Sequence, residues 1–422
     1  MPRILPSLFW QARKEISPLA AQLLPACRDL ESAAHELRWI REHVRDTKSP
    51  IPNKLRMWKL VEKRASGVPL QYVLGTQPFG DLEIKCRPGV LIPRPETEAY
   101  TLHLASLLSH SQHPPPKSLS ILDLCTGTGC IPLLLLHSLL AAPSTRNIPI
   151  DIHGVDISPR AVRLARENQA HNTAVLRLLP RPASSSPSPS SSSPSGAGPR
   201  YTLDFARHDI FSPALVPAVR QRLRLRLRDR DREGEGEGEQ GGDEQPGGGA
   251  LDLLVSNPPY ISPSDFAAST ARAVRNHEPR PALVPDFHHH HHHLLLLHRQ
   301  SPEAGDRRPY PYPYPYRCRP EDVFYARLRE IAAALRPRRV LMEVGGWDQA
   351  RRVVGLLFTS GDAGAETAET GDPEGGGGLE GYEVEIWRDE PAAGDRGERV
   401  QLAGREVVVR GVGNGRAVYL YR

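Results

Sequence analysis

Residues 251–261 read Leu-Asp-Leu-Leu-Val-Ser-Asn-Pro-Pro-Tyr-Ile, and this stretch decides the fold. The apolar run Leu251–Val255 predicts a short buried strand. Pro258 and Pro259 cannot continue a central strand, because proline has no backbone N–H to donate to the ladder. The strand therefore ends in a stiff loop. Open α/β sheets bind their ligands at the carboxyl ends of their strands, so this loop is a candidate binding site.

The loop residues Asn257, Pro258, Pro259 and Tyr260 suit a ligand that carries a planar NH2 group. One hydrogen of that group can bind the Asn257 side-chain oxygen and the other the Pro258 carbonyl, while Tyr260 stacks on the group that carries the nitrogen. The nitrogen then faces an electrophile in one direction, so orientation and charge placement promote the reaction without a base or a metal. The alternative is a proline-rich turn in which Asn257 is only a turn residue.

A second turn indicates where a cofactor binds. It reads Cys125-Thr126-Gly127-Thr128-Gly129 and lies between a strand expected at Ser120–Leu124 and a helix expected at Cys130–Leu140. The two glycines allow the backbone to approach a ligand closely at a helix N-terminus. A Gly-x-Gly turn alone is a weak signal, because it lacks the full dinucleotide-binding pattern.

An acidic residue after the next strand strengthens this interpretation. The strand expected at Ile150–Val155 ends in Asp156, whose carboxylate can accept both hydroxyl hydrogens of a ribose. The alternative is a surface aspartate beside the start of a helix. Further strands complete a doubly wound α/β sheet: they are expected at Tyr201–His208, followed by Asp209 and Ile210, and at Arg339–Glu343, Tyr382–Arg388 and Ala417–Tyr421.

Composition excludes several classes of protein. The chain has 422 residues and a net charge of +5, a mild basic excess that permits an RNA-bearing or acidic partner without favouring one. The five cysteines are scattered without a Cys-x-x-Cys pair, which argues against a disulfide framework or a zinc site. The longest apolar run, Ile131–Ala142, is too short to cross a membrane.

Three regions are expected. Residues 1–66 have helical periodicity and predict a small substrate-recognition domain, residues 67–98 predict a β-hairpin linker, and residues 99–422 hold the sheet. Four low-complexity stretches interrupt the last region and cannot bury enough apolar surface to fold, so they are expected to be disordered inserts. They lie near 182–199, 228–249, 288–316 and 359–378.

The glycine turn, Asp156 and the Asn-Pro-Pro-Tyr loop, in this order, resemble the HemK/PrmC family. Its members are protein-(glutamine-N5) methyltransferases that act on peptide-chain release factors. The resemblance covers nearly all of the chain outside the four low-complexity stretches. Additional segments that look like family motifs are Gly67–Tyr72, Leu91–Glu98, His277–Pro279, Ala282–Val284, Met342–Gly345 and Arg388-Asp389.

The resemblance implies a Rossmann-like, seven-stranded class I methyltransferase sheet that binds S-adenosylmethionine. It implies that the turn at 125–129 lies against the methionine part of the cofactor, that Asp156 binds the ribose, and that Asp209 and Ile210 flank the adenine. Asn257 would lie against the cofactor and, with the rest of its loop, hold the substrate glutamine amide. Two residues depart from the family pattern and bear on cofactor affinity: Cys125 stands where glycine is common, and Ile210 where an aromatic residue can stack on the adenine.

Alternative functions remain open. An adenine-N6 nucleic-acid methyltransferase can use the same loop, because adenine also presents a planar NH2, but it should carry a base-flipping pocket and a dense basic face. A cofactor-binding structural protein without turnover would tolerate the loss of Asn257. Neither DNA, RNA nor a membrane is needed for the favoured activity, and a monomer is expected.

The compartment is expected to be the mitochondrion, with the cytoplasm as the alternative. Long low-complexity inserts suggest a eukaryotic chain, and the helical region before residue 66 resembles bacterial members of the family more than the shorter cytosolic branch. The first fourteen residues also contain Arg3, Arg13 and Lys14 and no acid, which is compatible with a transit segment.

Overall fold

The computed structural model describes residues 4–110, 117–178, 201–234, 251–285, 318–358, 379–394 and 397–422. Three of the expected inserts, 182–199, 288–316 and 359–378, lie outside these residues. The fourth, 228–249, is corrected at its start, because helix α10 (Leu215–Gly234) continues to Gly234.

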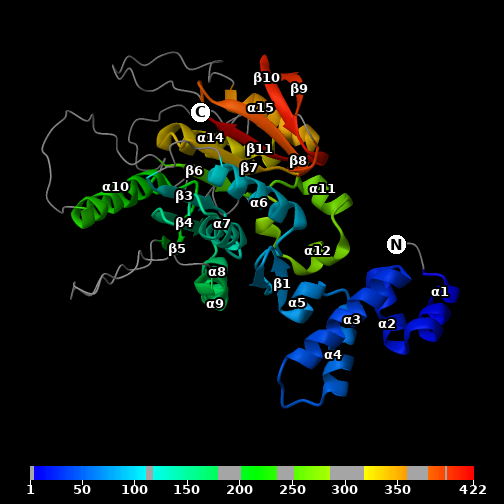
Figure 1. Cartoon of the computed structure of the whole chain (residues 1–422). Helices are drawn as coiled ribbons and strands as arrows, with labels where there is room; N and C mark the ends of the chain where they lie inside the picture. The colour runs from blue at the N-terminus through cyan, green and yellow to red at the C-terminus, as the bar shows by residue number, and fades with distance from the viewer. Residues whose placement is uncertain are drawn as a thin grey trace, which may run out of the picture.

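Helices form the N-terminal region, which Figure 1 shows as a lobe beside the rest of the molecule. They are α1 (Pro6–Gln11), a π-helical turn (Ala12–Ile16), α2 (Pro18–Cys27), α3 (Leu30–Asp46) and α4 (Asn53–Ala65). Asp29 caps α3 by accepting a hydrogen bond from the Ser32 backbone at 2.7 Å. The helices pack around one apolar cluster that includes Leu23, Leu37 and Val61.

The segment between this lobe and the sheet contains a short helix that the sequence did not predict, α5 (Leu70–Leu74). Gly75, with a φ of 86°, ends it in the left-handed region that suits glycine. The expected hairpin follows as β1 (Thr76–Phe79) and β2 (Leu82–Lys85), and the long helix α6 (Pro95–His110) leads into the sheet.

A nine-stranded sheet in the order β5-β4-β3-β6-β7-β11-β8-β10-β9 forms the centre of the molecule. The strands β3 to β7 pair in parallel, and β11 runs antiparallel between β7 and β8. Seven strands make the sheet that the family resemblance implies: β3 (Leu119–Leu124), β4 (Ile150–Asp156), β5 (Tyr201–Arg207), β6 (Leu253–Ser256), β7 (Arg339–Glu343), β8 (Glu383–Glu390) and β11 (Val412–Tyr421). The chain order reverses between β3 and β6, which is the switch point where such sheets bind ligands.

Two more strands, β9 (Glu398–Leu402) and β10 (Arg405–Arg410), extend the sheet beyond β8. They form an antiparallel hairpin, and β10 pairs in parallel with β8. The sequence analysis predicted neither strand: β9 is an edge strand whose side chains are mostly polar and exposed, whereas β10 buries Val407 and Val409 and was missed.

Helices cover both faces of the sheet, as Figure 1 shows. On one face, α6, α7 (Cys130–Ala141) and α8 (Pro159–His171) pack on Ile121, Ile152 and other strand residues. The other face carries α10, α14 (Val323–Leu335) and α15 (Trp347–Phe358), which pack on alternate strand residues such as Leu122 and Leu254. The strands are therefore buried on both sides, as parallel sheets are.

Short elements complete the fold. They are α9 (Thr173–Leu178), α11 (Pro263–Ala268), α12 (Arg272–His277) and two 3-10 turns at Arg280–Ala282 and Pro320–Asp322. No helix within the described ranges has both the length and the apolar character needed to cross a membrane.

Candidate active site

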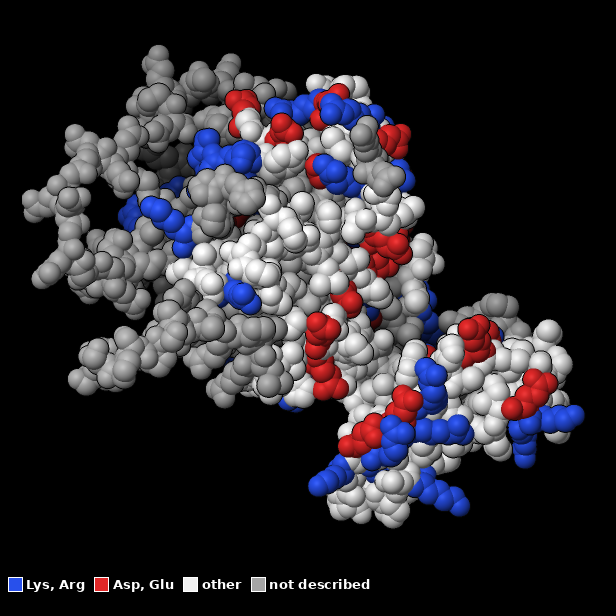
Figure 2. All heavy atoms as spheres, in the orientation of Figure 1, with Lys and Arg blue, Asp and Glu red and all other residues white. Residues whose placement is uncertain are grey.

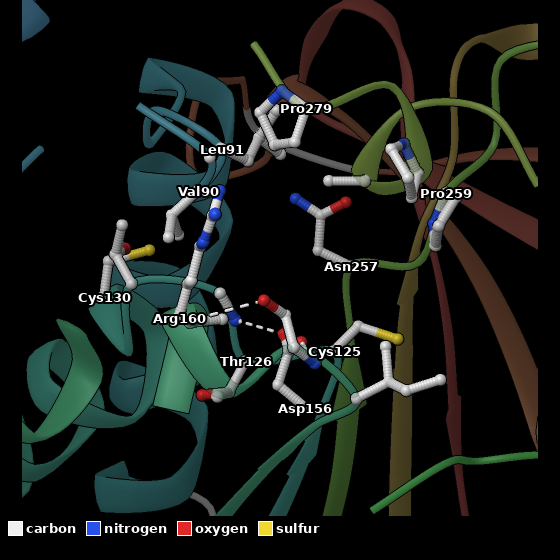
Figure 3. A pocket seen from close by; sticks show the side chains of 18 of the residues that line it. Val90, Leu91, Cys125, Thr126, Cys130, Asp156, Arg160, Asn257, Pro259 and Pro279 are labelled. Atoms are coloured by element: carbon white, nitrogen blue, oxygen red, sulfur yellow. Dashed lines mark hydrogen bonds between the residues drawn. The ribbon is translucent and has the colours of Figure 1, made fainter. Parts of the chain in front are cut away.

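A cavity of about 550 Å³ opens at the carboxyl ends of β3, β4 and β6. It lies at the switch point, where both sequence-predicted loops meet. Figure 3 shows its lining seen from close by. Most of the predicted site residues line it: Cys125, Thr126, Gly127, Thr128, Asp156, Asp209, Ile210, Asn257 and Pro259. Gly129, Pro258 and Tyr260 do not belong to the lining.

Every second residue of the glycine turn has a positive φ: Cys125 at 64°, Gly127 at 55° and Gly129 at 77°. The two glycines have different surroundings. A Cβ on Gly127 would meet no atom within 4 Å, whereas a Cβ on Gly129 would come within 3.0 Å of side-chain atoms of Ala165 and Phe205. Gly127 thus borders the cavity, and Gly129 allows helix α7 to pack closely on its neighbours.

The Asp156 carboxylate is fixed by two backbone groups. The N–H of Gly127 donates to Oδ2 at 2.9 Å, and the N–H of Ser158 donates to Oδ1 at 2.8 Å. Burial raises the pKa of Asp156, and the two backbone hydrogen bonds oppose this rise. Each oxygen keeps a further lone pair, so the carboxylate can accept two more hydrogen bonds from the cavity.

Asp123, near the end of β3, is a buried acid that the sequence analysis did not single out. It is 0% exposed, and neither carboxylate oxygen has a hydrogen-bond partner among the described residues. Burial raises the pKa of Asp123 to about 8, and the adjacent Thr126 hydroxyl opposes that rise. Buried polar groups without a partner are rare, and a ligand or an ordered water usually supplies the missing donor. An acid inside the apolar run Leu122–Leu124 was the available signal.

One wall of the cavity is apolar. Ile210 is buried, and the Arg327 guanidinium donates from Nε to its carbonyl at 2.8 Å. Phe324, which comes from α14, also lines the cavity, and its ring meets that of Phe211 edge-on at 5.0 Å. An aromatic side chain therefore lies at this wall although position 210 is isoleucine. The sequence could not reveal this, because Phe324 is far from the turn along the chain.

The loop after β6 presents an amide to the cavity. The Ser256 hydroxyl donates to the Leu124 carbonyl at 2.8 Å, which joins the ends of β6 and β3. The Asn257 side chain points into the cavity in Figure 3, and it makes no hydrogen bond to any residue that the structure describes. Tyr260 turns away from the lining, and its hydroxyl donates to Glu343 at 3.2 Å. Its predicted stacking on a substrate stays a prediction.

Two segments that are remote in the chain close the opposite wall. Residues 89–94 and Pro279, Pro281 and Ala282 line it together. The carboxylate of Glu278, whose side chain is 1% exposed, accepts hydrogen bonds from the Ile92 N–H at 3.1 Å and the Arg94 guanidinium at 2.8 Å. Both segments belong to motifs noted in the sequence, but their meeting at the cavity could not be read from it.

Comparison with known proteins gives relatives of one kind, although no family model matches the chain. The mitochondrial MRF1 N(5)-glutamine methyltransferase MTQ1 of Saccharomyces cerevisiae is 33% identical over 287 residues, which cover 67% of this chain and 68% of that protein. The probable MRF1 mitochondrial N(5)-glutamine methyltransferase mtq1 of Schizosaccharomyces pombe is 30% identical over 287 residues, 66% of this chain and 73% of that protein. A release factor glutamine methyltransferase of Mycolicibacterium smegmatis is 30% identical over 253 residues, 60% of this chain and 63% of that protein.

Solved structures are more distant. The METTL16 methyltransferase domain without its N-terminus is 12% identical, with a TM-score of 0.34, over 84% of this chain and 95% of that one. A putative class I S-adenosylmethionine-dependent methyltransferase of Listeria monocytogenes is 11% identical, with a TM-score of 0.30, over 99% of this chain and 85% of that one.

Proposed function

The chain belongs to the family of release factor N(5)-glutamine methyltransferases and is a methyltransferase; we propose that it methylates the glutamine side chain of the Gly-Gly-Gln motif in a peptide-chain release factor. S-adenosylmethionine is the methyl donor that the fold and family imply. The observation that carries the proposal is the Asn257 amide, which faces the cavity at the switch point of the sheet and has no hydrogen-bond partner among the residues that the structure describes.

The cavity suits S-adenosylmethionine in size and in its polar groups. Its volume of about 550 Å³ falls within the range of roughly 300–1,000 Å³ that is usual for ligand pockets. When bound, the cofactor supplies an electrophilic methyl group on a positively charged sulfur. Asp156 places a carboxylate beside the glycine turn at the cavity, which supports the binding of a ligand with hydroxyl donors.

Each part of the lining has a proposed role. Asp156 accepts hydrogen bonds from the ribose hydroxyls with the lone pairs that Gly127 and Ser158 leave free. The turn at 125–129, at the N-terminus of α7, borders the methionine part, with Gly129 acting through packing. Asp209 and Ile210 flank the adenine, and Phe324 adds an aromatic face to that wall.

The loop orients the substrate. Asn257 Oδ1 and the Pro258 carbonyl accept the two hydrogens of the glutamine amide, which fixes the plane of that amide and directs its nitrogen to the methyl group. Pro258 and Pro259 stiffen the loop, so little entropy is lost when the amide binds. A preorganised acceptor pair of this kind acts through orientation and electrostatics, without a general base.

The N-terminal helices are proposed to capture the release factor. They carry Trp39 and Trp58, which are 43% and 46% exposed although tryptophan is usually buried. Figure 2 shows charged side chains of both signs over the same lobe. Exposed aromatic side chains are typical centres of protein interfaces. Substituting both tryptophans with alanine should raise the KM for intact release factor and leave cofactor binding unchanged. Leu225→Ala on α10 removes another exposed apolar side chain and is the matched control.

The proposed compartment is the mitochondrion, which the names of the two yeast relatives support. We propose a monomer that needs neither nucleic acid nor a membrane. Fluorescent tagging at the C-terminus tests the compartment, and a diffuse cytosolic signal would favour the cytoplasmic alternative.

A methyl-transfer assay tests the activity. Purified protein, S-adenosylmethionine and a mitochondrial release factor should give one added methyl group on the Gly-Gly-Gln glutamine, detected by mass spectrometry. Methylated adenine in DNA or RNA, with an unmodified release factor, would instead establish the adenine-N6 alternative.

A further inference from the structure

The side chain and carbonyl of Tyr260 are held by a group of residues outside the cavity lining. These residues are Glu343, at the end of β7, and Gly345 and Gln349, at the start of α15; we call them the Tyr260 socket. None of the three lines the cavity, so the binding of a cofactor does not account for their arrangement.

Glu343 binds two hydroxyl groups from different parts of the chain. Its carboxylate accepts a hydrogen bond from the Tyr260 hydroxyl at 3.2 Å and another from the Thr97 hydroxyl at 2.7 Å. The Glu343 residue is only 1% exposed. Thr97 lies in the first turn of α6 and lines the cavity. A single buried carboxylate thus connects the catalytic loop to the helix that borders the cavity.

The rest of the socket fits the ring and the backbone of Tyr260. A Cβ at position 345 would lie 3.0 Å from Cδ2 of the Tyr260 ring, so only glycine leaves the ring its present room. The Gln349 amide donates to the Tyr260 carbonyl at 3.2 Å and to the Asp322 carboxylate at 2.9 Å. The Gln349 side-chain oxygen accepts from the Gly345 N–H at 2.8 Å.

We propose that Glu343 is a positioning residue for methyl transfer, which acts by holding Tyr260 and so sets the place of Asn257. The inference rests on the proposed function, in which Asn257 holds the substrate amide. Only Pro258 and Pro259 separate Asn257 from Tyr260, and their fixed φ angles transmit the position of Tyr260 along the loop. Displacing a reacting group by about 1 Å can lower a rate about 100-fold, so a small shift at Tyr260 matters.

Substitutions of Glu343 and Tyr260 test the proposal together. Glu343→Leu removes both acceptors, and Tyr260→Phe removes one donor; each should lower kcat about 100-fold while the KM for S-adenosylmethionine changes by less than about threefold. Because both changes break the same contact, the double variant should be about as slow as either single variant. Glu343→Gln keeps one acceptor and should recover kcat to within about tenfold of wild type.

A matched control separates positioning from loss of stability. The Tyr325 hydroxyl donates to the backbone carbonyl of Glu343 at 2.7 Å, and Tyr325 is fully buried. Tyr325→Phe therefore removes a buried hydrogen bond to the same residue without touching Tyr260. It should lower the melting temperature and leave kcat near wild type. If Tyr325→Phe slows the enzyme as much as Tyr260→Phe, the effect is general destabilisation and the proposal is wrong.

Amide hydrogen exchange gives a readout that needs no substrate. In Glu343→Gln and Tyr260→Phe, exchange should be faster at the N–H groups of Asn257, Tyr260 and Ile261. The N–H groups of β3 and β4 should exchange as in wild type and serve as controls. This measurement remains possible even if Glu343→Leu does not fold. If the variants exchange faster but the wild-type protein methylates no release factor, Glu343 does hold the loop at Asn257, and only the proposed function is refuted. Unchanged exchange and unchanged kcat in both variants would overturn the positioning role itself.

Discussion

The two glycines of the turn at 125–129 should respond to alanine in opposite ways. Both have positive φ, 55° at Gly127 and 77° at Gly129, so an alanine is strained at either position by about 1–2 kcal/mol. A more restricted unfolded chain offsets this by about 0.4–1 kcal/mol. The backbone alone therefore predicts a loss of about 1 kcal/mol of unfolding free energy for each variant.

Packing then separates the two variants. At position 129 the new Cβ would lie 3.0 Å from atoms of both Ala165 and Phe205, and such overpacking of a core adds about 1–3 kcal/mol. Gly129→Ala should thus lose about 2–4 kcal/mol of unfolding free energy. At position 127 nothing lies within 4 Å, but the Cβ would enter the cavity where the proposed cofactor lies. Gly127→Ala should lose only the backbone contribution of about 1 kcal/mol and bind S-adenosylmethionine at least tenfold more weakly.

Chemical denaturation and titration calorimetry measure these two quantities on the same samples. The expected pattern is a stability loss in Gly129→Ala and an affinity loss in Gly127→Ala. If Gly127→Ala binds the cofactor as tightly as wild type, the turn does not lie against the cofactor and the cavity assignment is wrong. If Gly129→Ala is as stable as wild type, the close packing described for that residue is not a constraint.

Three further outcomes are expected. Glu278→Ala should lower the unfolding free energy by about 1–3 kcal/mol, because it leaves the buried Ile92 N–H and the partly exposed Arg94 without their acceptor. It should also weaken cofactor binding in calorimetry, and unchanged binding would show that this wall of the cavity is not needed. Since burial raises the pKa of Asp123 to about 8, the folded state keeps a proton there that the unfolded state loses near pH 4, so stability should fall as pH rises from about 4 to 8. Asp123→Asn should flatten that decline in denaturation curves measured across this range, and an equally steep decline would rule out Asp123 as its source. Phe324→Ala should weaken cofactor binding about tenfold or more, because it removes the aromatic ring from the apolar wall that is proposed to flank the adenine. Unaltered affinity would show that the adenine binds elsewhere.

Much of the sheet could be predicted because its central strands are buried on both faces. Apolar runs such as Leu253–Ser256 and Arg339–Glu343 are therefore visible in the sequence itself. The edge strand β9 could not be predicted in this way, because its side chains are mostly polar and exposed. Its neighbour β10 does bury Val407 and Val409, and this alternation was a signal that the sequence analysis missed. Helix α5 escaped notice because it has only five residues between Pro69 and Gly75.

The site residues also fall into those that the sequence predicts and those that it does not. Residues that follow directly on a strand, such as Asp156 and Asn257, could be placed because the carboxyl ends of parallel strands meet at one edge. Phe324, Glu278 and Glu343 reach the site or its supports through tertiary packing, which a linear pattern does not record. The sequence did single out the segments that hold Glu278 and Glu343 as motifs, but their contacts appear only once the chain is folded.

The most direct test of the proposed mechanism is the rate at which Asn257→Ala methylates the Gly-Gly-Gln glutamine of a release factor. Removing one preorganised hydrogen-bonding group from an active site commonly lowers the rate about 10²–10³-fold. Asn257→Ala should therefore bind S-adenosylmethionine within about tenfold of wild type in calorimetry, and mass spectrometry should find methylation slowed by about two to three orders of magnitude. Methylation by Asn257→Ala at a rate near that of wild type would contradict the role of the loop in holding the substrate amide.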